Sequence, residues 1–356
     1  MARALTGGFA LLLALLPAGR ARAAEDPPVF EVGLEMTNIT ATVRDERGNL
    51  VSDLRAEDFL VREDGRPQQL QVFGATAEEI QAGQKSPRDA LLHCTRCDET
   101  ARVKAGETVR PCANGHTTFD FGERKELALN LGMLFDTSES MRNELRLSQE
   151  SAIRFLEAIP RAKDLLLVFF DRDIRISRYD SENQQGIFER ILDTQGGGFT
   201  ALRDAIAVYL SRVWDSPGRK VLVLFSDGAD TTSSIGPMEL QRMVRSAAVT
   251  IYPVAFAGEY ARGSQGAHKA SEFLSELATE SGGRVFEPRA SKELAAIYQT
   301  ILDELGSQYV LGYVSDNAAR DGHYRKVAVE VKRPGLRVRC RPGYDAPKDA
   351  PPPKGK

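Results

Sequence analysis

The sequence predicts an α/β protein in which a doubly wound, mostly parallel sheet of Rossmann-like form is inserted into a smaller, discontinuous β-sandwich. In residues 126–307, short apolar segments alternate with segments of helical periodicity, which is the pattern of a parallel sheet covered on both faces. Residues 28–75 and 308–345 instead alternate apolar and polar residues, which is typical of half-buried antiparallel strands. A polar, cysteine-rich insert, residues 76–125, precedes the α/β part.

The two outer segments are expected to form a single sandwich. In the first of them, residues 59–73 have the pattern of a hairpin whose turn is Glu63-Asp64-Gly65. Neither segment contains enough strands to bury a hydrophobic face alone. Since the two ends of an inserted α/β domain commonly emerge close together, we expect the strands of both segments to form one unit rather than two unrelated additions.

Within the α/β part, apolar periodicity and turn residues bound each element. The expected strands are residues 127–135, 165–170, 174–179, 221–225, 250–257 and 284–286. The expected helices are residues 143–159, 184–192, 201–214, 238–248, 271–279 and 294–306. Asp171 and Asp173 lie between two expected strands, and we interpret this acidic pair as a tight turn rather than a metal or phosphate site.

The N-terminal end of the chain has the composition of a targeting signal, and the C-terminal end has the composition of a disordered tail. Residues 1–23 resemble a secretory signal, with Arg3, an apolar run at residues 9–16 and a small-residue cleavage site ending at Ala23. The run is shorter than the roughly 20 apolar residues that span a bilayer. We therefore expect an exported protein, periplasmic or extracellular, without a membrane span; an uncleaved anchor is the alternative. Residues 346–356, rich in Pro and Lys, are expected to be disordered.

Overall charge argues against nucleic acid as a partner. The chain of 356 residues has a formal net charge of −3, with 42% hydrophobic and 27% charged residues. No segment carries a basic block of the kind that binds nucleic acid or anionic membranes. The composition is that of a globular protein of two or three units, and it leaves the oligomeric state open.

The insert contains a pattern of soft metal ligands. Cys94 and Cys97 are followed by Cys112 and His116, which gives C-x2-C, fourteen residues, and C-x3-H. This spacing is typical of a closed structural zinc site. Disulfides are the main alternative, because the four cysteines, counting Cys340, are an even number in a chain expected to be exported; free thiols are a third.

Acid and hydroxyl side chains follow the first strand of the α/β part. Asp136, Ser138 and Ser140 occupy alternate positions where the chain should leave the sheet. In open α/β sheets, ligands bind outside the carboxyl ends of the strands. Oxygen donors of this kind suit a hard cation such as Mg²⁺. The alternative is an ordinary helix start, since Asp and Ser are favoured capping residues.

Three sequence motifs resemble those of the von Willebrand factor type A domain. They are DTSES, GGGFTALRDAI and KVLVLFSDGAD, in that order along the chain. The flanking segments also resemble exported bacterial proteins related to this family. The resemblance implies a metal-ion-dependent adhesion site for Mg²⁺, or for Mn²⁺ or Ca²⁺. The implied ligands are Asp136, Ser138, Ser140, Thr200 and Asp227, the last directly or through water.

The chain departs from the family pattern beside Thr200. Phe199 stands immediately before this threonine, where a glycine is usual in the family. We expect Phe199 to form an apolar rim beside the ion, with Asp230 at the edge of the site. Thr200 is also expected to open the helix that follows it.

The predicted function is non-catalytic capture of a protein partner that presents Asp or Glu. A divalent cation held by one full carboxylate and neutral hydroxyls keeps positive charge for such a ligand. One alternative is a structural role, in which the cation staples loops within an envelope assembly. A metal-dependent hydrolase is a weaker alternative, because no histidine lies in the motifs, no GxSxG elbow is present, and Ser138 stands where a DxDxT phosphatase needs an acid.

Overall fold

The structure is a computed structural model of the chain. It describes residues 36–75, 89–94, 100–104, 119–121, 129–158, 164–179, 184–214, 216, 218–256, 265–288 and 293–348. The predicted signal segment, Cys97, Cys112 and His116 of the cysteine motif, and residues 349–356 of the predicted tail lie outside these residues, so they stay predictions. The prediction of disorder is wrong for residues 346–348, because the N–H of Ala346 donates to the carbonyl of His323 at 2.9 Å and Lys348 forms a bridge with Asp321. Cys340 is a free, partly buried cysteine.

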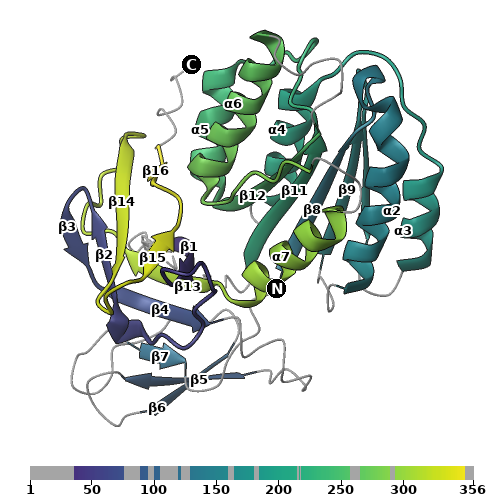
Figure 1. Cartoon of the computed structure of the whole chain (residues 1–356). Coiled ribbons are helices and arrows are strands. Elements are labelled where there is room, and N and C mark those ends of the chain that lie inside the picture. The colour runs from purple at the N-terminus through teal and green to yellow at the C-terminus, as the bar shows by residue number, and fades with distance from the viewer. Residues whose placement is uncertain are drawn as a thin grey trace, which may run out of the picture. The chain divides into compact units, whose positions relative to one another are not determined.

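A five-stranded sheet forms the centre of the α/β domain (Figure 1). Its strands are β8 (Leu129–Asp136), β9 (Asp164–Phe170), β10 (Ile174–Tyr179), β11 (Arg219–Ser226) and β12 (Val249–Ala255). Their order is β10-β9-β8-β11-β12, and only the edge strand β10 runs antiparallel to its neighbour. Residues 174–179, expected to form a strand, are therefore the antiparallel edge strand of this sheet.

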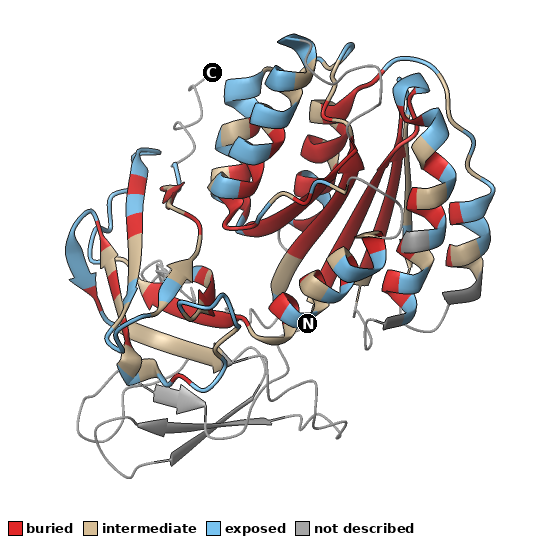
Figure 2. Ribbon diagram, in the orientation of Figure 1, coloured by how far each residue is buried: buried red, intermediate tan, exposed pale blue. Residues whose placement is uncertain are grey.

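Helices cover both faces of this sheet. One core cluster joins the sheet to α2 (Arg142–Ala158), α3 (Gln184–Leu192) and α7 (Leu294–Gly306). The other cluster joins it to α4 (Leu202–Val213), α5 (Pro237–Ala247) and α6 (Gln265–Ser281). Figure 2 shows the result, with buried strands between helices whose outer faces are exposed. The doubly wound, mostly parallel architecture predicted from the sequence is confirmed.

The expected strand at residues 284–286 is not a strand. Phe286 makes a single bridge with Val254, through backbone bonds to Pro253 and Ala255. Further along the outer edge of β12, the N–H of Ile251 donates to the hydroxyl of Ser281, at the end of α6. The Ser281 hydroxyl thus accepts a hydrogen bond from a backbone N–H of β12 that would otherwise pair with a sixth strand.

Two four-stranded sheets form the β-sandwich. The first, in the order β15-β1-β13-β4, contains β15 (Arg337–Arg339), β1 (Met36–Arg44), β13 (Tyr309–Val314) and β4 (Leu70–Ala75). The second, in the order β16-β14-β2-β3, contains β16 (Gly343–Asp345), β14 (Tyr324–Val331), β2 (Phe59–Glu63) and β3 (Arg66–Gln68). Each sheet mixes strands from before and after the α/β domain, and the two share one hydrophobic core. The predicted discontinuous sandwich is confirmed.

A third, three-stranded sheet occupies part of the segment between β4 and β8. Its strands are β5 (Asp89–Cys94), β6 (Thr100–Lys104) and β7 (Phe119–Phe121), in the order β6-β5-β7. The polar, cysteine-rich sequence of this segment did not predict these strands. Cys94 is the last residue of β5.

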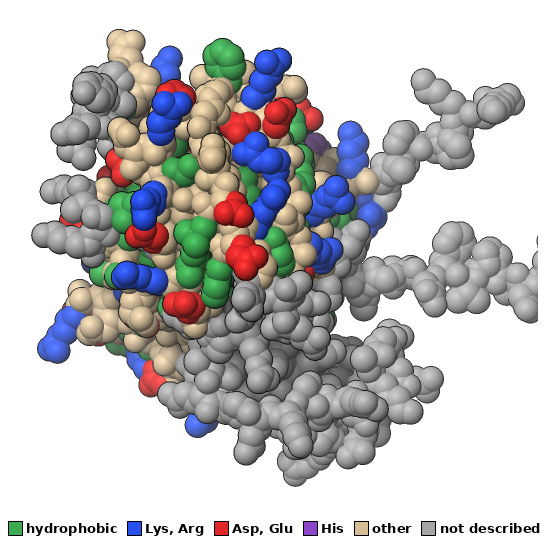
Figure 3. Space-filling view, turned by 90° about the vertical axis from the view of Figure 1, so that its right-hand side faces the viewer, with side chains coloured by type: hydrophobic (Ala, Val, Ile, Leu, Met, Phe, Trp, Pro, Cys, Tyr) green, Lys and Arg blue, Asp and Glu red, His purple; other side chains and the backbone are tan. Residues whose placement is uncertain are grey.

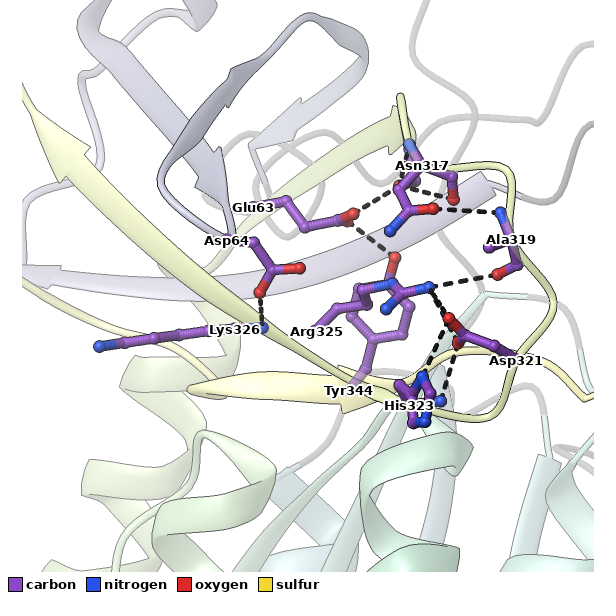
Figure 4. A network of polar contacts seen from close by, with 10 residues as sticks. Glu63, Asp64, Asn317, Ala319, Asp321, His323, Arg325, Lys326 and Tyr344 are labelled. Carbon is purple, nitrogen blue, oxygen red and sulfur yellow. Dashed lines mark hydrogen bonds and ion pairs between the residues drawn. The ribbon is translucent and has the colours of Figure 1, made fainter.

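A buried carboxylate ties the two sheets of the sandwich together. Glu63, the first residue of the predicted turn, is the last residue of β2, and Asp64 and Gly65 after it both have positive φ, as primed hairpin turns require. Its side chain accepts hydrogen bonds from the hydroxyls of Tyr313 (2.9 Å) and Ser315. It also accepts one from the hydroxyl of Tyr344 (2.8 Å), which Figure 4 shows. Because Tyr313 belongs to the opposite sheet, these bonds satisfy the buried acid and link the layers.

A second buried acid joins α7 to the sandwich. Glu304, in the last turn of α7, is completely buried. It pairs with Arg44 of β1 at 2.8 Å, with Arg284 at 3.4 Å, and with Arg339 of β15. Burial by itself raises the pKa of Glu304, but the three guanidinium groups outweigh it and hold that pKa below its ordinary value of 4.5.

We expect Glu304→Gln to lower the free energy of unfolding at pH 7 by about 3 kcal/mol, because it leaves three arginines without their carboxylate. The folded-state pKa is lowered, so the stabilisation is fully present above pH 4.5 and is lost as the pH falls through the folded-state value. Urea unfolding between pH 3 and pH 7 measures both effects. Glu330→Gln, which removes an exposed pair with Arg62 at 3.9 Å, is the control. An unchanged acid dependence in the Glu304 variant would contradict this assignment.

Candidate metal centre

The site is built at the carboxyl edge of the central sheet, where β8 and β11 end side by side. Asp136 is the last residue of β8 and is 1% exposed. Its Oδ1 accepts the backbone N–H of Ser138 at 3.0 Å, and its Oδ2 accepts the hydroxyl of Ser226, the last residue of β11, at 2.6 Å. One buried carboxylate thus links the two central strand ends.

The ionised form of Asp136 is destabilised by burial. Burial raises the pKa of Asp136 to about 6, against the hydrogen bonds from Ser138 and Ser226 that lower it, and the nearby charge of Asp227 raises it further. No lysine or arginine pairs with Asp136 among the residues that the structure describes. A buried carboxylate without a cationic partner is the kind of group that a bound cation stabilises.

Two hydroxyls lie next to this carboxylate. The Oγ atoms of Ser138 and Ser140 are 3.2 Å apart; Ser138 is buried, and Ser140 is exposed in the middle of a short 3-10 turn, Glu139–Met141. Ser138 occupies the capping position of this turn, but its side chain makes no capping bond. The capping alternative therefore does not account for the Ser138 hydroxyl.

The glycine loop before Thr200 is fastened to the Asp136 loop by its backbone. The N–H of Gly197 donates to the carbonyl of Thr137 at 2.6 Å, and the N–H of Glu139 donates to the carbonyl of Gly198 at 3.2 Å. Gly198 has φ +88°, a conformation that side-chain-bearing residues rarely adopt. Glycines are needed here because the backbone of this loop approaches the Asp136 loop closely and then reverses direction.

Thr200 is buried and faces a third loop. Its N–H donates to the hydroxyl of Thr231 at 2.9 Å, and its carbonyl accepts the N–H groups of Thr231 and Thr232. These bonds hold Thr200 outside the helix, so α4 begins at Leu202 with Ala201 in the capping position. The prediction that Thr200 opens the helix is therefore wrong by one residue.

Asp227 follows β11 and is half-buried. Its Oδ1 accepts the N–H of Ala229 at 2.9 Å, and the Ser226 hydroxyl accepts the N–H of Gly228 at 3.0 Å. A side chain at Gly228 would meet the carbonyl of Ala270 at 2.7 Å, so glycine is required for this turn. The turn places Asp227 close enough to Asp136 for their charges to interact.

The two expected rim residues lie in different settings. Phe199 is 61% exposed, beside Thr200. The carboxylate of Asp230 is nearly buried and accepts the N–H of Arg203, in the first turn of α4, at 2.8 Å and the hydroxyl of Ser233, in its own loop, at 2.6 Å. Asp230 therefore has a structural role in holding the third loop against α4.

Sequence reasoning missed the contribution of Ser226, which it treated as a residue that merely ends a strand. The structure gives its hydroxyl a direct bond to Asp136. The available signal was positional: Ser226 ends the strand beside β8, so its side chain reaches the same edge. Beneath both residues, the rings of Phe169, Phe135 and Phe225 stack across three strands, with centroids 5.2 and 4.8 Å apart.

The chemistry of these side chains fits a hard divalent cation. The Asp136 carboxylate and the Ser138 and Ser140 hydroxyls are oxygen donors, and oxygen ligands are those that Mg²⁺ and Mn²⁺ prefer. Among the described residues there is no group of three or more His, Cys, Asp or Glu side chains arranged for a metal ion. A site here would therefore rely on two acids, Asp136 and Asp227, together with hydroxyls.

A doubly wound α/β domain with acids and hydroxyls at its carboxyl edge belongs to the class of open-sheet domains that bind ligands at strand ends. Residues 130–300 match the family model of the von Willebrand factor type A domain. This part of the chain is a von Willebrand factor type A domain, a type of protein-interaction module.

Individual relatives are distant. A UPF0353 protein of Mycobacterium avium is 26% identical over 217 residues, which cover 53% of this chain and 64% of that protein. A von Willebrand factor type A structure from Catenulispora acidiphila is 13% identical, covers 83% of this chain and 76% of its own, and has a TM-score of 0.43. BatB from Bacteroides thetaiotaomicron is 13% identical over 50% of this chain and all of its own, with a TM-score of 0.40. Within the described residues, no helix has the length and apolarity needed to cross a membrane.

Proposed function

We propose that this domain uses a divalent cation, Mg²⁺ or Mn²⁺, to capture an acidic residue of a partner protein, without catalysis. The cation would be held by Asp136, Ser138, Ser140 and Thr200, with Asp227 acting directly or through water. A cation held mainly by one carboxylate keeps positive charge, so an Asp or Glu of the partner is a favourable further ligand. The observation that carries the proposal is the buried Asp136 carboxylate, which lacks a cationic partner among the described side chains.

The pattern of bonds around the site argues for ligand exchange rather than for a staple. The three loops are already joined without a cation, through the Gly197 bond to Thr137, the Glu139 bond to Gly198 and the Thr231 and Thr232 bonds to Thr200. A cation needed only to hold the loops together would duplicate these contacts. We therefore assign the cation a binding role.

A non-catalytic role is supported by the residue types at the site. Neither of the histidines whose side chains are described, His268 in α6 and His323 before β14, lies in the three loops. The Ser226 hydroxyl donates to the carboxylate of Asp136, which is itself a proposed ligand of the cation. Hydrolysis by a bound cation would need a group placed to take a proton from water, and none of these residues supplies one.

A protein is the partner that surface charge favours. The net charge of the chain is −3. On the face shown in Figure 3, acidic and basic side chains of the described residues are interspersed, without the basic stripe that marks nucleic-acid binding. The exposed ring of Phe199 adds an apolar surface beside the site. With the signal-like N-terminus, we propose an exported protein whose partner lies in the cell envelope.

The test is capture of envelope proteins by the immobilised full-length chain. We expect proteins to be retained in Mg²⁺, released by EDTA, and no longer retained after their carboxylates have been amidated. Asp136→Ala should abolish retention. Asp204→Asn is the matched control, because Asp204 accepts the N–H groups of Ser234 and Ile235 near the site without being a proposed ligand. Retention that survives EDTA or amidation would contradict the proposal.

A further inference from the structure

Thr137 stands between two proposed ligands but points away from them, toward the neighbouring strand. The residue is completely buried. Its hydroxyl lies 3.0 Å from the carbonyl of Phe170 and 3.1 Å from Oδ2 of Asp171, and it accepts a hydrogen bond from the Arg175 guanidinium at 3.0 Å. One side chain inside the DTSES motif is therefore held by three groups at the end of β9 and on β10.

The backbone of Thr137 is held equally firmly. Its N–H donates to the carbonyl of Phe170 at 2.7 Å, and its carbonyl accepts the N–H of Gly197 at 2.6 Å. Every polar group of this residue has a partner, and the partners come from the adjacent strand and from the glycine loop. The positions of Asp136 and Ser138, on either side, depend on these contacts.

Asp171 and Arg175 form the other half of the arrangement. Arg175 donates to Oδ2 of Asp171 at 2.9 Å as well as to Thr137. Asp171 also accepts the N–H of Asp173 in the turn before β10. Through its backbone carbonyl, Asp171 accepts the N–H of Ala201 at 2.8 Å, the residue next to Thr200. Asp171 therefore contacts the first loop with its side chain and the second loop with its backbone.

The chemistry of Thr137 is more specific than packing requires. A buried valine would have nearly the same shape and would need no hydrogen-bond partners. A hydroxyl at this position instead fixes the rotamer of Thr137 and its distance from Asp171 and Arg175. Groups that hold metal-binding loops in this way commonly tune the affinity of the ion without touching it.

We infer that Thr137, Asp171 and Arg175 are positioning residues, which together set the placement of Asp136 and Ser138 relative to Thr200 and thereby determine the affinity of the site for its cation. This inference rests on the proposed function. The three side chains contact the loops and are not proposed ligands of the cation. The pair of Arg175 and Asp171 also fixes the end of the antiparallel edge strand against the binding edge of the sheet.

The experiment measures Mn²⁺ affinity by equilibrium dialysis in full-length variants, with thermal unfolding in EDTA alongside. Thr137→Val should weaken Mn²⁺ binding by about 10- to 100-fold, the usual effect of removing a group that supports metal ligands. Thr137→Ser keeps the hydroxyl and should restore most of the affinity. A merely structural role would lower the unfolding temperature of Thr137→Val and leave its Mn²⁺ affinity unchanged, and that result would overturn the inference.

A pair of arginines on one strand supplies the matched control. Arg175→Met removes the contact with Thr137, whereas Arg178→Met removes a similar ion pair, with Asp164 at 2.5 Å, at the other end of the strand pair. Weaker Mn²⁺ binding in Arg175→Met but not in Arg178→Met is expected, and equal affinities in the two would overturn the inference. These variants do not alter a buried residue, so they remain informative if Thr137→Val fails to fold. A wild-type chain that binds no Mn²⁺ would instead refute the proposed function itself.

Discussion

Asp136→Asn is expected to remove the stabilisation that Mg²⁺ gives the wild-type chain, while the variant remains folded in EDTA. In EDTA the wild-type protein buries a carboxylate whose pKa is raised to about 6, a cost on the order of 3 kcal/mol relative to a solvated acid. The amide keeps an oxygen to accept the N–H of Ser138 but carries no charge. We therefore expect the variant to be as stable as the wild-type protein in EDTA, or more stable.

Mg²⁺ should reverse this order. A ligand that binds only the folded state adds about 2.7 kcal/mol to the free energy of unfolding at 100 times its Kd. The wild-type chain should gain this stabilisation, and Asp136→Asn should gain none. Urea unfolding in EDTA and in saturating Mg²⁺ measures both states. Asp204→Asn should lose stability equally in the two media and keep its response to Mg²⁺, since Asp204 caps a neighbouring loop. Stabilisation of Asp136→Asn by Mg²⁺ would contradict the ligand assignment.

Gly132→Ala is expected to be the most destabilising single-methyl change in the central sheet, at about 3 kcal/mol or more. Gly132 lies in the middle of β8, where a Cβ atom would sit 2.1 Å from Cε2 of Tyr209. The ring cannot retreat easily, because it is completely buried on α4 and its hydroxyl donates to the carbonyl of Val221 at 3.0 Å. Either the helix or the strand must move, and β8 carries Asp136.

Urea unfolding measures this effect against a glycine that tolerates a side chain. Gly236, the N-cap residue of α5, has φ −74°, and a Cβ atom added there would meet no other atom within 4 Å. Gly236→Ala should therefore cost only about 0.5 to 1 kcal/mol, the loss expected when alanine replaces glycine at a helix N-cap. Combining Gly132→Ala with Tyr209→Leu should recover part of the loss, because the smaller side chain vacates the overlap. A cost below about 1 kcal/mol for Gly132→Ala would show that α4 packs more loosely on β8 than these distances require.

The sequence indicated the architecture because hydrophobic periodicity is a local signal. The apolar run at residues 127–135 became β8, and the alternating segments on either side of the α/β part became one sandwich. Errors occurred where a long-range contact replaced a local rule. Phe286 pairs with β12 through a single bridge, and Thr200 is kept out of α4 by Thr231.

The candidate site was predictable to a similar extent. Position along the chain identified Asp136 as the residue at a strand end, and the structure places it beside Ser138, Ser226 and the charge of Asp227. Position along the chain could not reveal that Asp230 bonds to Arg203, 27 residues earlier in the chain. Nor could it show that Arg175, from an edge strand, reaches into the DTSES loop. Both contacts depend on how the loops fold over the sheet edge, which periodicity does not encode.

The most direct test of the account is the binding isotherm of Mn²⁺ to the full-length chain and to Asp136→Asn, measured by equilibrium dialysis at neutral pH. Saturable binding to the wild-type chain that is absent from the variant is the predicted result. Equal binding by the two proteins, or no binding by either, would contradict the assignment of the Asp136 edge as a cation-dependent interaction site.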